Sequence, residues 1–179
     1  MAIRRPRMVA VVHCVGGSPL REGIAREELP NDCAQILALH PDGISACAFG
    51  CLGGGSCASA CRKNAIVVEN GVARVIRGRC VGCGLCAKAC PRHLITLEPP
   101  ENTISVRCSN QSKPPVARKE CKNSCIGCGI CERSCPADAI HVVDGYAQID
   151  ANQCIACGMC ATKCPRGVIH DGRGIFTVE

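Results

Sequence analysis

Three stretches of the chain carry cysteines at the same spacing, Cys-x2-Cys-x2-Cys-x3-Cys-Pro. They run over residues 80–91, 125–136 and 154–165. Three thiolates on one tight loop can reach three irons of a cubic cluster, and the fourth cysteine then points to a neighbouring cluster. A tetrahedral zinc site uses two separated cysteine pairs, so a third cysteine between them would have no role. The spacing therefore predicts [4Fe-4S] clusters.

The chain also repeats itself at an offset of 74 residues. This offset relates the motif at 80–91 to the motif at 154–165. It also relates two pairs of short β-rich runs, over 65–76 and 139–149, each with an Asn-Gly or Asp-Gly turn that is typical of a β-hairpin. The chain is therefore an internal duplication of two units that begin near residues 47 and 121. We expect one hairpin and two cysteine motifs in each unit.

The first motif of the first unit departs from the regular spacing. Gly54 stands where the second unit has Cys128, and Arg62 stands where proline is expected. The nearest replacement ligand is Cys47, four residues before Cys51. Exchange of the fourth ligand within each unit then predicts four clusters. Their ligands would be Cys47, Cys51, Cys57 and Cys90; Cys61, Cys80, Cys83 and Cys86; Cys125, Cys128, Cys131 and Cys164; and Cys135, Cys154, Cys157 and Cys160.

A glycine follows the second cysteine of each regular motif, which fits a loop that needs positive φ close to sulfide. These glycines are Gly84, Gly129 and Gly158.

Four cysteines remain, which is the number that a fifth [4Fe-4S] cluster needs: Cys14, Cys33, Cys108 and Cys121. A fifth cluster would tie the N-terminal segment to the connection between the units, and this segment otherwise offers nothing to fold around. The alternative is four buried or incidental thiols, since free cysteine packs well as a small hydrophobe. Cys47 and Cys121 are equivalent in the repeat, so the assignment of these two leading cysteines rests on spacing alone.

The composition also indicates that metal supplies stability. The 179 residues include 20 Cys, no Trp, one Tyr and two Phe, so little apolar volume is available for a core. We recognise neither a signal peptide nor a membrane-spanning stretch, and therefore expect a cytoplasmic protein with reduced, metal-bound thiols. Five clusters at about −2 each would reverse the formal charge of +6. Because basic residues are also not interleaved with aromatic ones, we expect no nucleic-acid partner.

Four segments resemble the B subunit of Rnf-type electron transport complexes, within a similarity from about Met8 to His170. They are Val11–Gly17, Cys47–Cys57, Val106–Asn110 and Cys121–Cys131. The resemblance implies a relay of electrons between reduced ferredoxin and a membrane-bound, flavin-containing partner coupled to NAD. That subunit normally begins with a membrane helix and a separate cluster-binding segment. Neither has a counterpart in this sequence, so we expect no membrane anchor or ion pumping.

Together these features predict an α+β protein of two tandem bacterial ferredoxin-like lobes with a small cysteine-containing N-terminal segment. The predicted division is 1–46 for the N-terminal segment, 47–107 for lobe 1, 108–120 for the inter-lobe linker and 121–179 for lobe 2. We expect an electron-transfer subunit with no catalytic site of its own, between ferredoxin and a flavoprotein or NAD-linked subunit. It would be peripheral to a membrane complex or fully soluble. The alternatives are a free-standing polyferredoxin carrier and, third, a structural zinc-thiolate module.

Overall fold

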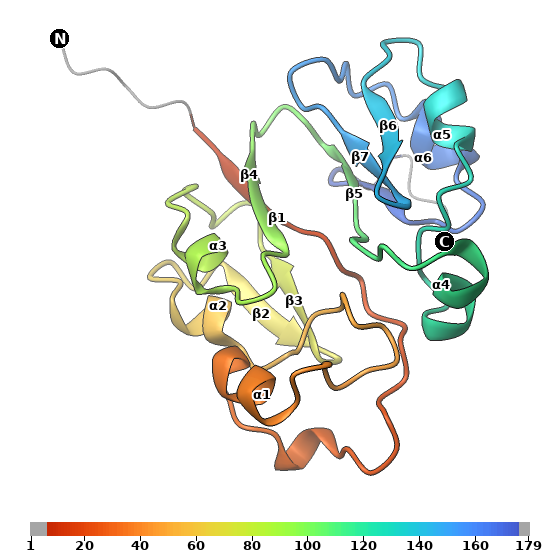
Figure 1. Ribbon diagram of the computed structural model, residues 1–179. Helices are drawn as coiled ribbons and strands as arrows, with labels where there is room; N and C mark the ends of the chain where they lie inside the picture. The colour runs from red at the N-terminus through yellow and green to blue at the C-terminus, as the bar shows by residue number, and fades with distance from the viewer. Residues whose placement is uncertain (1–6, 176–179) are drawn as a thin grey trace, which may run out of the picture.

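The computed structural model describes residues 7–175, which form short helices and two-stranded antiparallel sheets (Figure 1). This mixture agrees with the expected α+β class. The strands are β1 (Val9–Val12), β2 (Ile66–Glu69), β3 (Val72–Val75), β4 (Ile95–Glu98), β5 (Ile104–Val106), β6 (Ile140–Val143), β7 (Tyr146–Ile149) and β8 (Ile169–Asp171). The helices are η1 (Arg26–Glu28), α1 (Cys33–Leu39), α2 (Ser56–Ser59), α3 (Leu85–Ala89), α4 (Pro114–Glu120), α5 (Ile130–Arg133) and α6 (Met159–Lys163).

Both predicted hairpins are present. β2 pairs with β3, and β6 pairs with β7, in antiparallel register. The turn residues Asn70-Gly71 and Asp144-Gly145 have positive φ at both positions. This is the backbone of a type I′ turn, whose twist matches that of the flanking strands. The turn chemistry of the sequence therefore sets the register of each hairpin.

A second sheet closes each half of the molecule with strands from outside the expected units. β1 pairs with β4, and β5 pairs with β8. β1 is buried at all four positions and β5 at all three, so both are core strands of the halves that they join. The strand pairing therefore differs from the expected boundaries at 46/47 and 107/108. Figure 1 shows β1–β4 with α2 and α3 on one side, and β5–β8 with α5 and α6 on the other.

Each half has a small core in which cysteines pack among aliphatic side chains. In the first half this core consists of Ala10, Val12, Cys57, Ile66, Ala73, Cys86 and Ile95. In the second half it consists of Ile104, Val106, Cys108, Cys125, Cys131, Ile140, Ala147, Cys160, Ala161, Val168 and Ile169. The cysteine side chains that could bind metal are thus part of the packing of both halves.

The loop between β1 and α2 has a third apolar core, made by Ile36, Ile44 and Leu52 beside Cys33. The expectation that the N-terminal segment has only a cluster to fold around was therefore wrong. Asp32 caps α1, because its Oδ1 accepts hydrogen bonds from the backbone N–H groups of Ala34 and Gln35, both at 2.9 Å. The bond from Gln35 is the main cause that lowers the pKa of Asp32.

The expected linker between the halves contains a helix. α4 begins with two prolines, which suit the first turn of a helix because their φ is preset and no N–H is needed there. Its Ala117 is fully buried, and the carbonyl of Ala117 accepts a hydrogen bond of 2.8 Å from the hydroxyl of Ser124. α4 therefore packs onto the second half rather than spanning a gap.

Candidate metal centres

The four loops that carry the cysteine motifs share one backbone conformation. In each loop, φ is positive two residues after the first cysteine and again at the residue that caps the following helix. The positive φ predicted after the second cysteine of the regular motifs is confirmed. Such turns direct backbone N–H groups into a concavity that suits an anionic group. The residues two positions after the first cysteine are Gly53, Gly82, Gly127 and Ala156. The helix-capping residues are Gly55, Gly84, Gly129 and Gly158.

The second half brings its eight motif cysteines together in the two sets that the spacing predicted. Site 4 is the cavity lined by Cys125, Cys128, Cys131 and Cys164. Site 5 is the cavity lined by Cys135, Cys154, Cys157 and Cys160. Burial raises the pKa of the Cys131 thiol to about 11 and that of Cys160 to about 12, with other cysteines of the same cavities as neighbours. The fourth cysteine of each motif is exchanged between the sites.

In the first half, the name site 1 is used for the set predicted at Cys61, Cys80, Cys83 and Cys86, of which Cys80, Cys83 and Cys86 are neighbours. Cys61 and Cys80 pack against the core that contains Cys86. Burial raises the pKa of Cys86, and Cys80 and Cys83 are its charged neighbours. Backbone N–H groups point at the other sulfurs: Ala10 donates to Cys80 Sγ at 3.4 Å and Ala65 donates to Cys61 Sγ at 3.3 Å.

Site 2 differs from the predicted set in one residue. Its cavity is lined by Cys33, Cys51, Cys57 and Cys90, and Cys47 is not among the lining residues. Burial raises the pKa of the Cys57 thiol to about 12, and the neighbouring cysteines are Cys51, Cys33 and Cys90. The empty volumes of sites 2, 4 and 5 are similar, about 340, 330 and 320 Å³ with the solvent at their mouths. Cys33 therefore takes the place that Cys128 has in site 4.

Gly54 explains why Cys33 can take this place. A Cβ atom at position 54 would lie 2.7 Å from Ile36 Cδ1 and 2.9 Å from the backbone nitrogen of Cys33. The first turn of α1 thus occupies the space where the side chain of a regular motif would begin. Ser56 holds this turn, because its hydroxyl accepts a 2.7 Å hydrogen bond from Cys33 N–H and donates to Asp32 Oδ2 at 3.2 Å.

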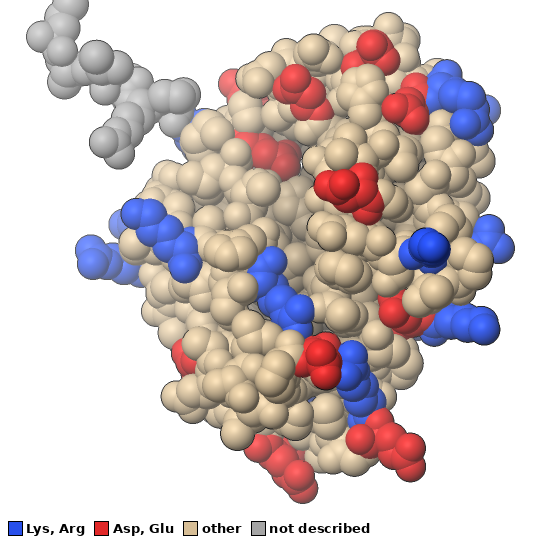
Figure 2. All heavy atoms as spheres, viewed as in Figure 1, with Lys and Arg blue, Asp and Glu red and all other residues tan. Residues whose placement is uncertain are grey.

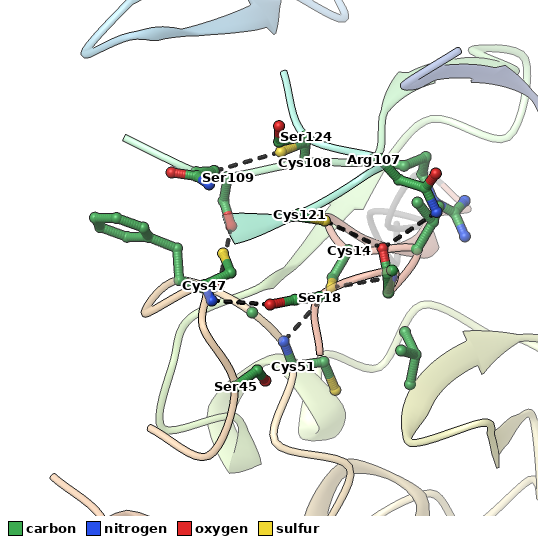
Figure 3. A pocket seen from close by; sticks show the side chains of 18 of the residues that line it. Cys14, Ser18, Ser45, Cys47, Cys51, Arg107, Cys108, Ser109, Cys121 and Ser124 are labelled. Atoms are coloured by element: carbon green, nitrogen blue, oxygen red, sulfur yellow. Dashed lines mark hydrogen bonds between the residues drawn. The ribbon is translucent and has the colours of Figure 1, made fainter. Parts of the chain in front are cut away.

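Site 3 lies between the halves and is lined by Cys14, Cys47, Cys108 and Cys121 (Figure 3). Its empty volume is about 550 Å³ with solvent included. Burial raises the pKa of Cys47 to about 12, and the thiols that surround it are Cys121, Cys108 and Cys14. Cys51 also lines the cavity through its backbone, but Figure 3 shows its sulfur directed away.

The two halves contribute to site 3 in the same way. Cys14 follows β1 by two residues, and Cys108 follows β5 by two residues. Cys14 Sγ accepts hydrogen bonds from the N–H groups of Gly16 and Cys51, at 3.4 and 3.5 Å. Cys108 Sγ accepts from Asn110 and Cys125, at 3.5 and 3.2 Å. The two halves of the chain are thus arranged around site 3 in an approximately two-fold manner.

Equivalent arginines hold the two leading cysteines of site 3. Arg92 donates to the carbonyl of Ala48, next to Cys47. Arg166, which is 74 residues later, donates to the carbonyl of Lys122, next to Cys121. The repeat equivalence of Cys47 and Cys121 is therefore also a structural equivalence. A ligand assignment that kept repeat-equivalent cysteines in equivalent roles would have found site 3 from the sequence.

Several polar side chains position the ligands, and cysteine spacing could not identify them. Ser18 accepts a 2.8 Å hydrogen bond from Cys47 N–H and donates to the carbonyl of Glu120 at 2.7 Å, which joins both leading-cysteine loops. Arg107 lines site 3. Burial lowers the pKa of Arg107, and its Nε has no hydrogen-bond partner among residues 7–175. A buried cation there would favour a negatively charged group in the cavity.

The donor sets have the ligand composition of [4Fe-4S] clusters, whereas no group of three or more His, Cys, Asp or Glu side chains among residues 7–175 is arranged to hold a single metal ion. Each site offers four cysteine sulfurs, which is the ligand set of such a cluster. Backbone N–H groups donate to sulfurs in all five sites; besides the bonds already given, they reach Cys90, Cys125 and Cys135. Hydrogen bonds of this kind stabilise bound thiolates and influence cluster potentials. Because burial holds many of these thiols protonated, cluster binding would release protons.

Two regions of the chain match families of known iron–sulfur proteins. Residues 124–168 and residues 79–140 each match a family described as a 4Fe-4S dicluster domain. The first match covers sites 4 and 5. The second joins two motifs that are consecutive in sequence, although the structure places them in different halves. Both matches support an iron–sulfur electron-transfer role for this part of the chain.

A more specific similarity agrees with the resemblance seen in the sequence. The chain is 37% identical over 145 residues to the B subunit of the Na(+)-translocating ferredoxin:NAD(+) oxidoreductase complex of Acetobacterium woodii. The aligned region covers 80% of this chain and 43% of that protein, so the chain spans less than half the length of its relative. The resemblance to the Rnf-type B subunit is confirmed. Within residues 7–175, no helix has the length and apolar character that crossing a membrane requires.

Proposed function

We propose that the chain is an electron-relay subunit with five [4Fe-4S] clusters, one at each of sites 1 to 5, bound by all 20 cysteines. The observation that carries this proposal is the composition of site 3. Each half supplies the cysteine after its outer strand, Cys14 or Cys108, and its leading cysteine, Cys47 or Cys121. Four incidental thiols would have no reason to converge from both halves in equivalent positions.

The five sites form one unbranched series. Sites 1 and 2 exchange their fourth ligands, as do sites 4 and 5. The N–H of Cys51 in site 2 donates to Cys14 Sγ in site 3, and the N–H of Cys125 in site 4 donates to Cys108 Sγ in site 3. One backbone hydrogen bond therefore separates site 3 from each neighbour. Bound clusters would supply the redox chemistry, and the protein fixes their order and excludes water between them.

We also propose that the two halves are tandem ferredoxin-like lobes whose limits follow strand pairing. The first lobe would run from β1 to β4 and include the loop with α1, and the second would run from β5 to β8. Cys33 then belongs to the first lobe as a ligand. Site 3 joins the lobes in space, and residues 99–103 between β4 and β5 connect them along the chain.

For partners, we propose ferredoxin and a flavin- or NAD-linked subunit of an oxidoreductase complex. Support comes from the relative, which is named as a subunit of a ferredoxin:NAD(+) oxidoreductase complex. Association with a membrane would then depend on partner subunits. A free-standing polyferredoxin is the alternative, and the solvent-exposed Cys83 and Cys157 at both ends of the series suit it as well. Co-purification with a flavin- or NAD-binding chain from native cells supports the subunit, and recovery of the chain alone supports the carrier.

The test of the relay is anaerobic preparation followed by iron analysis and reductive titration. Five clusters require about 20 iron atoms per chain, and each cluster takes up one electron, so about five electrons should be consumed. Values of about 16 iron and four electrons would mean that one of the five sites binds no cluster. A colourless preparation without iron would contradict the proposal.

A further inference from the structure

The two ends of the series carry exposed ligand loops with apolar tips. In site 1, Cys83 is exposed and its neighbour Val81 is 54% exposed. In site 5, Cys157 is exposed beside Ile155 and Met159 at 65% and 45%. Electrons that enter or leave the series need such accessible points. Cys128 of site 4 is also exposed, but its loop neighbour Ile126 is buried. An exposed cysteine beside an exposed apolar side chain therefore marks the two ends as contact points for another protein.

The two ends differ in charge. Four basic side chains, each within two residues of a site 1 cysteine, are exposed around site 1: Arg62, Lys63, Arg79 and Lys88. The 74-residue offset places uncharged residues around site 5 instead: Pro136, Ala137, Gln153 and Thr162. No Asp or Glu occurs between residues 70 and 97, whereas Asp138 and Asp150 flank the motifs of site 5. By the same criterion the site 5 end has one exposed basic side chain, Arg133 beside Cys135, so the site 1 end carries the larger positive charge.

These charges are available to a partner. None of the four basic side chains forms an ion pair with another residue in the described part of the chain. Figure 2 shows a group of Lys and Arg side chains on the side of the molecule where Figure 1 places α2 and α3. Unpaired like charges that surround an exposed redox loop attract an oppositely charged partner and accelerate its association.

We propose that the site 1 face, defined by Arg62, Lys63, Arg79, Lys88 and the Cys83 loop, docks a small acidic electron-carrier protein. This inference rests on the proposed function, since docking brings the carrier to the terminal cluster. The basic side chains attract the acidic surface of the carrier, and Val81 provides an apolar contact near the ligand loop. An anionic membrane is less well suited as the occupant, because α2 and α3 have only four and five residues and cannot form an interfacial helix of useful length.

The test compares two holo-protein variants that lose the same charge. The site 1 variant carries Arg62→Gln, Lys63→Ala, Arg79→Gln and Lys88→Thr. The control removes four exposed charges around α4, with Lys113→Gln, Arg118→Gln, Lys119→Gln and Lys122→Gln. The probe is an acidic 2[4Fe-4S] ferredoxin, whose association rate is measured anaerobically by biolayer interferometry at several salt concentrations. Iron is counted in every preparation.

We expect the site 1 variant to associate about tenfold more slowly or worse at low salt and to lose most of the salt dependence. The control should retain more than half of the parental rate. Equal rates for parent and site 1 variant, or an equal loss in the control, would overturn the docking surface. Charge-dependent binding to phosphatidylserine vesicles, with an unchanged ferredoxin rate, would overturn it in favour of a membrane. Association is measured independently of the iron content. A low iron content would therefore contradict the proposed function, whereas an unchanged association rate of the site 1 variant would contradict the docking surface.

Discussion

The two halves of the chain contain ten cysteines each and differ in the place of one of them. Eight cysteines of the first half have an equivalent 74 residues later, and Cys14 and Cys108 each follow an outer strand by two residues. The tenth cysteine is Cys33 in the first half and Cys128 in the second. The second half holds its ligand on the motif loop. The first half has Gly54 there and brings Cys33 from a separate helix into the vacated space. A missing ligand in a repeat can therefore be replaced from a distant segment that fits the same space.

Among the changes that test this comparison of the two halves, removal of iron should have the largest effect on their stability. Because cysteines are part of both cores, we expect chelation or oxidative cluster loss to unfold both halves despite their different ligand sources. Near-ultraviolet circular dichroism and limited proteolysis would measure the loss. A half that keeps cooperative thermal unfolding without iron would show that its core is sufficient alone.

Substitution of Gly54 should disrupt the structure of the first half only. We expect Gly54→Ala to displace the first turn of α1, because the new Cβ would lie 2.7 Å from Ile36 Cδ1. Overpacking of this kind costs about 1–3 kcal/mol, and displacement of Cys33 should remove about four iron atoms per chain. The matched control is Gly78→Ala, since a Cβ at position 78 meets nothing within 4 Å. Full iron content in Gly54→Ala would mean that α1 and site 2 are independent.

Loss of the Ser56 hydroxyl should have a smaller effect on the same contact. Ser56→Ala removes the 2.7 Å bond to Cys33 N–H and the 3.2 Å bond to Asp32. A buried hydrogen bond contributes about 1 kcal/mol, so a chelator should remove iron from site 2 about fivefold faster. Ser59→Ala on the exposed side of the same helix should leave the rate unchanged. Equal rates for both variants would show that the Ser56 bonds do not retain the ligand.

The sequence was sufficient for the features that depend on local spacing. The turns at Asn70-Gly71 and Asp144-Gly145 determine the hairpins, and the regular motifs of the second half line two cavities, sites 4 and 5, with the expected cysteines. The partners of β1 and β5 could not be predicted, because these strands pair with residues 63 to 89 positions away. Neither motif spacing nor turn chemistry constrains contacts over such distances.

The irregular motif misled the prediction for a physical reason. Cys47 is nearest to the gap in sequence, but its loop faces the second half, where Ser18 and Arg92 hold it beside Cys121. Cys33 lies 21 residues before Gly54, and only the fold of the intervening chain brings α1 back to site 2. The repeat itself contained the correct indication, since Cys47 and Cys121 are equivalent and occupy equivalent places in site 3.

The most direct test of the five-site arrangement is an iron count on two double variants, Cys33→Ala/Cys57→Ala and Cys47→Ala/Cys57→Ala, prepared anaerobically beside the parent. Alanine cannot replace a thiolate ligand, so each disrupted cluster removes about four iron atoms. The geometry places Cys33 and Cys57 in one site and Cys47 in another. We therefore predict a loss of about four iron atoms in the first variant and about eight in the second. The reverse result, eight in the first and four in the second, would contradict the arrangement and restore Cys47 as the ligand of site 2.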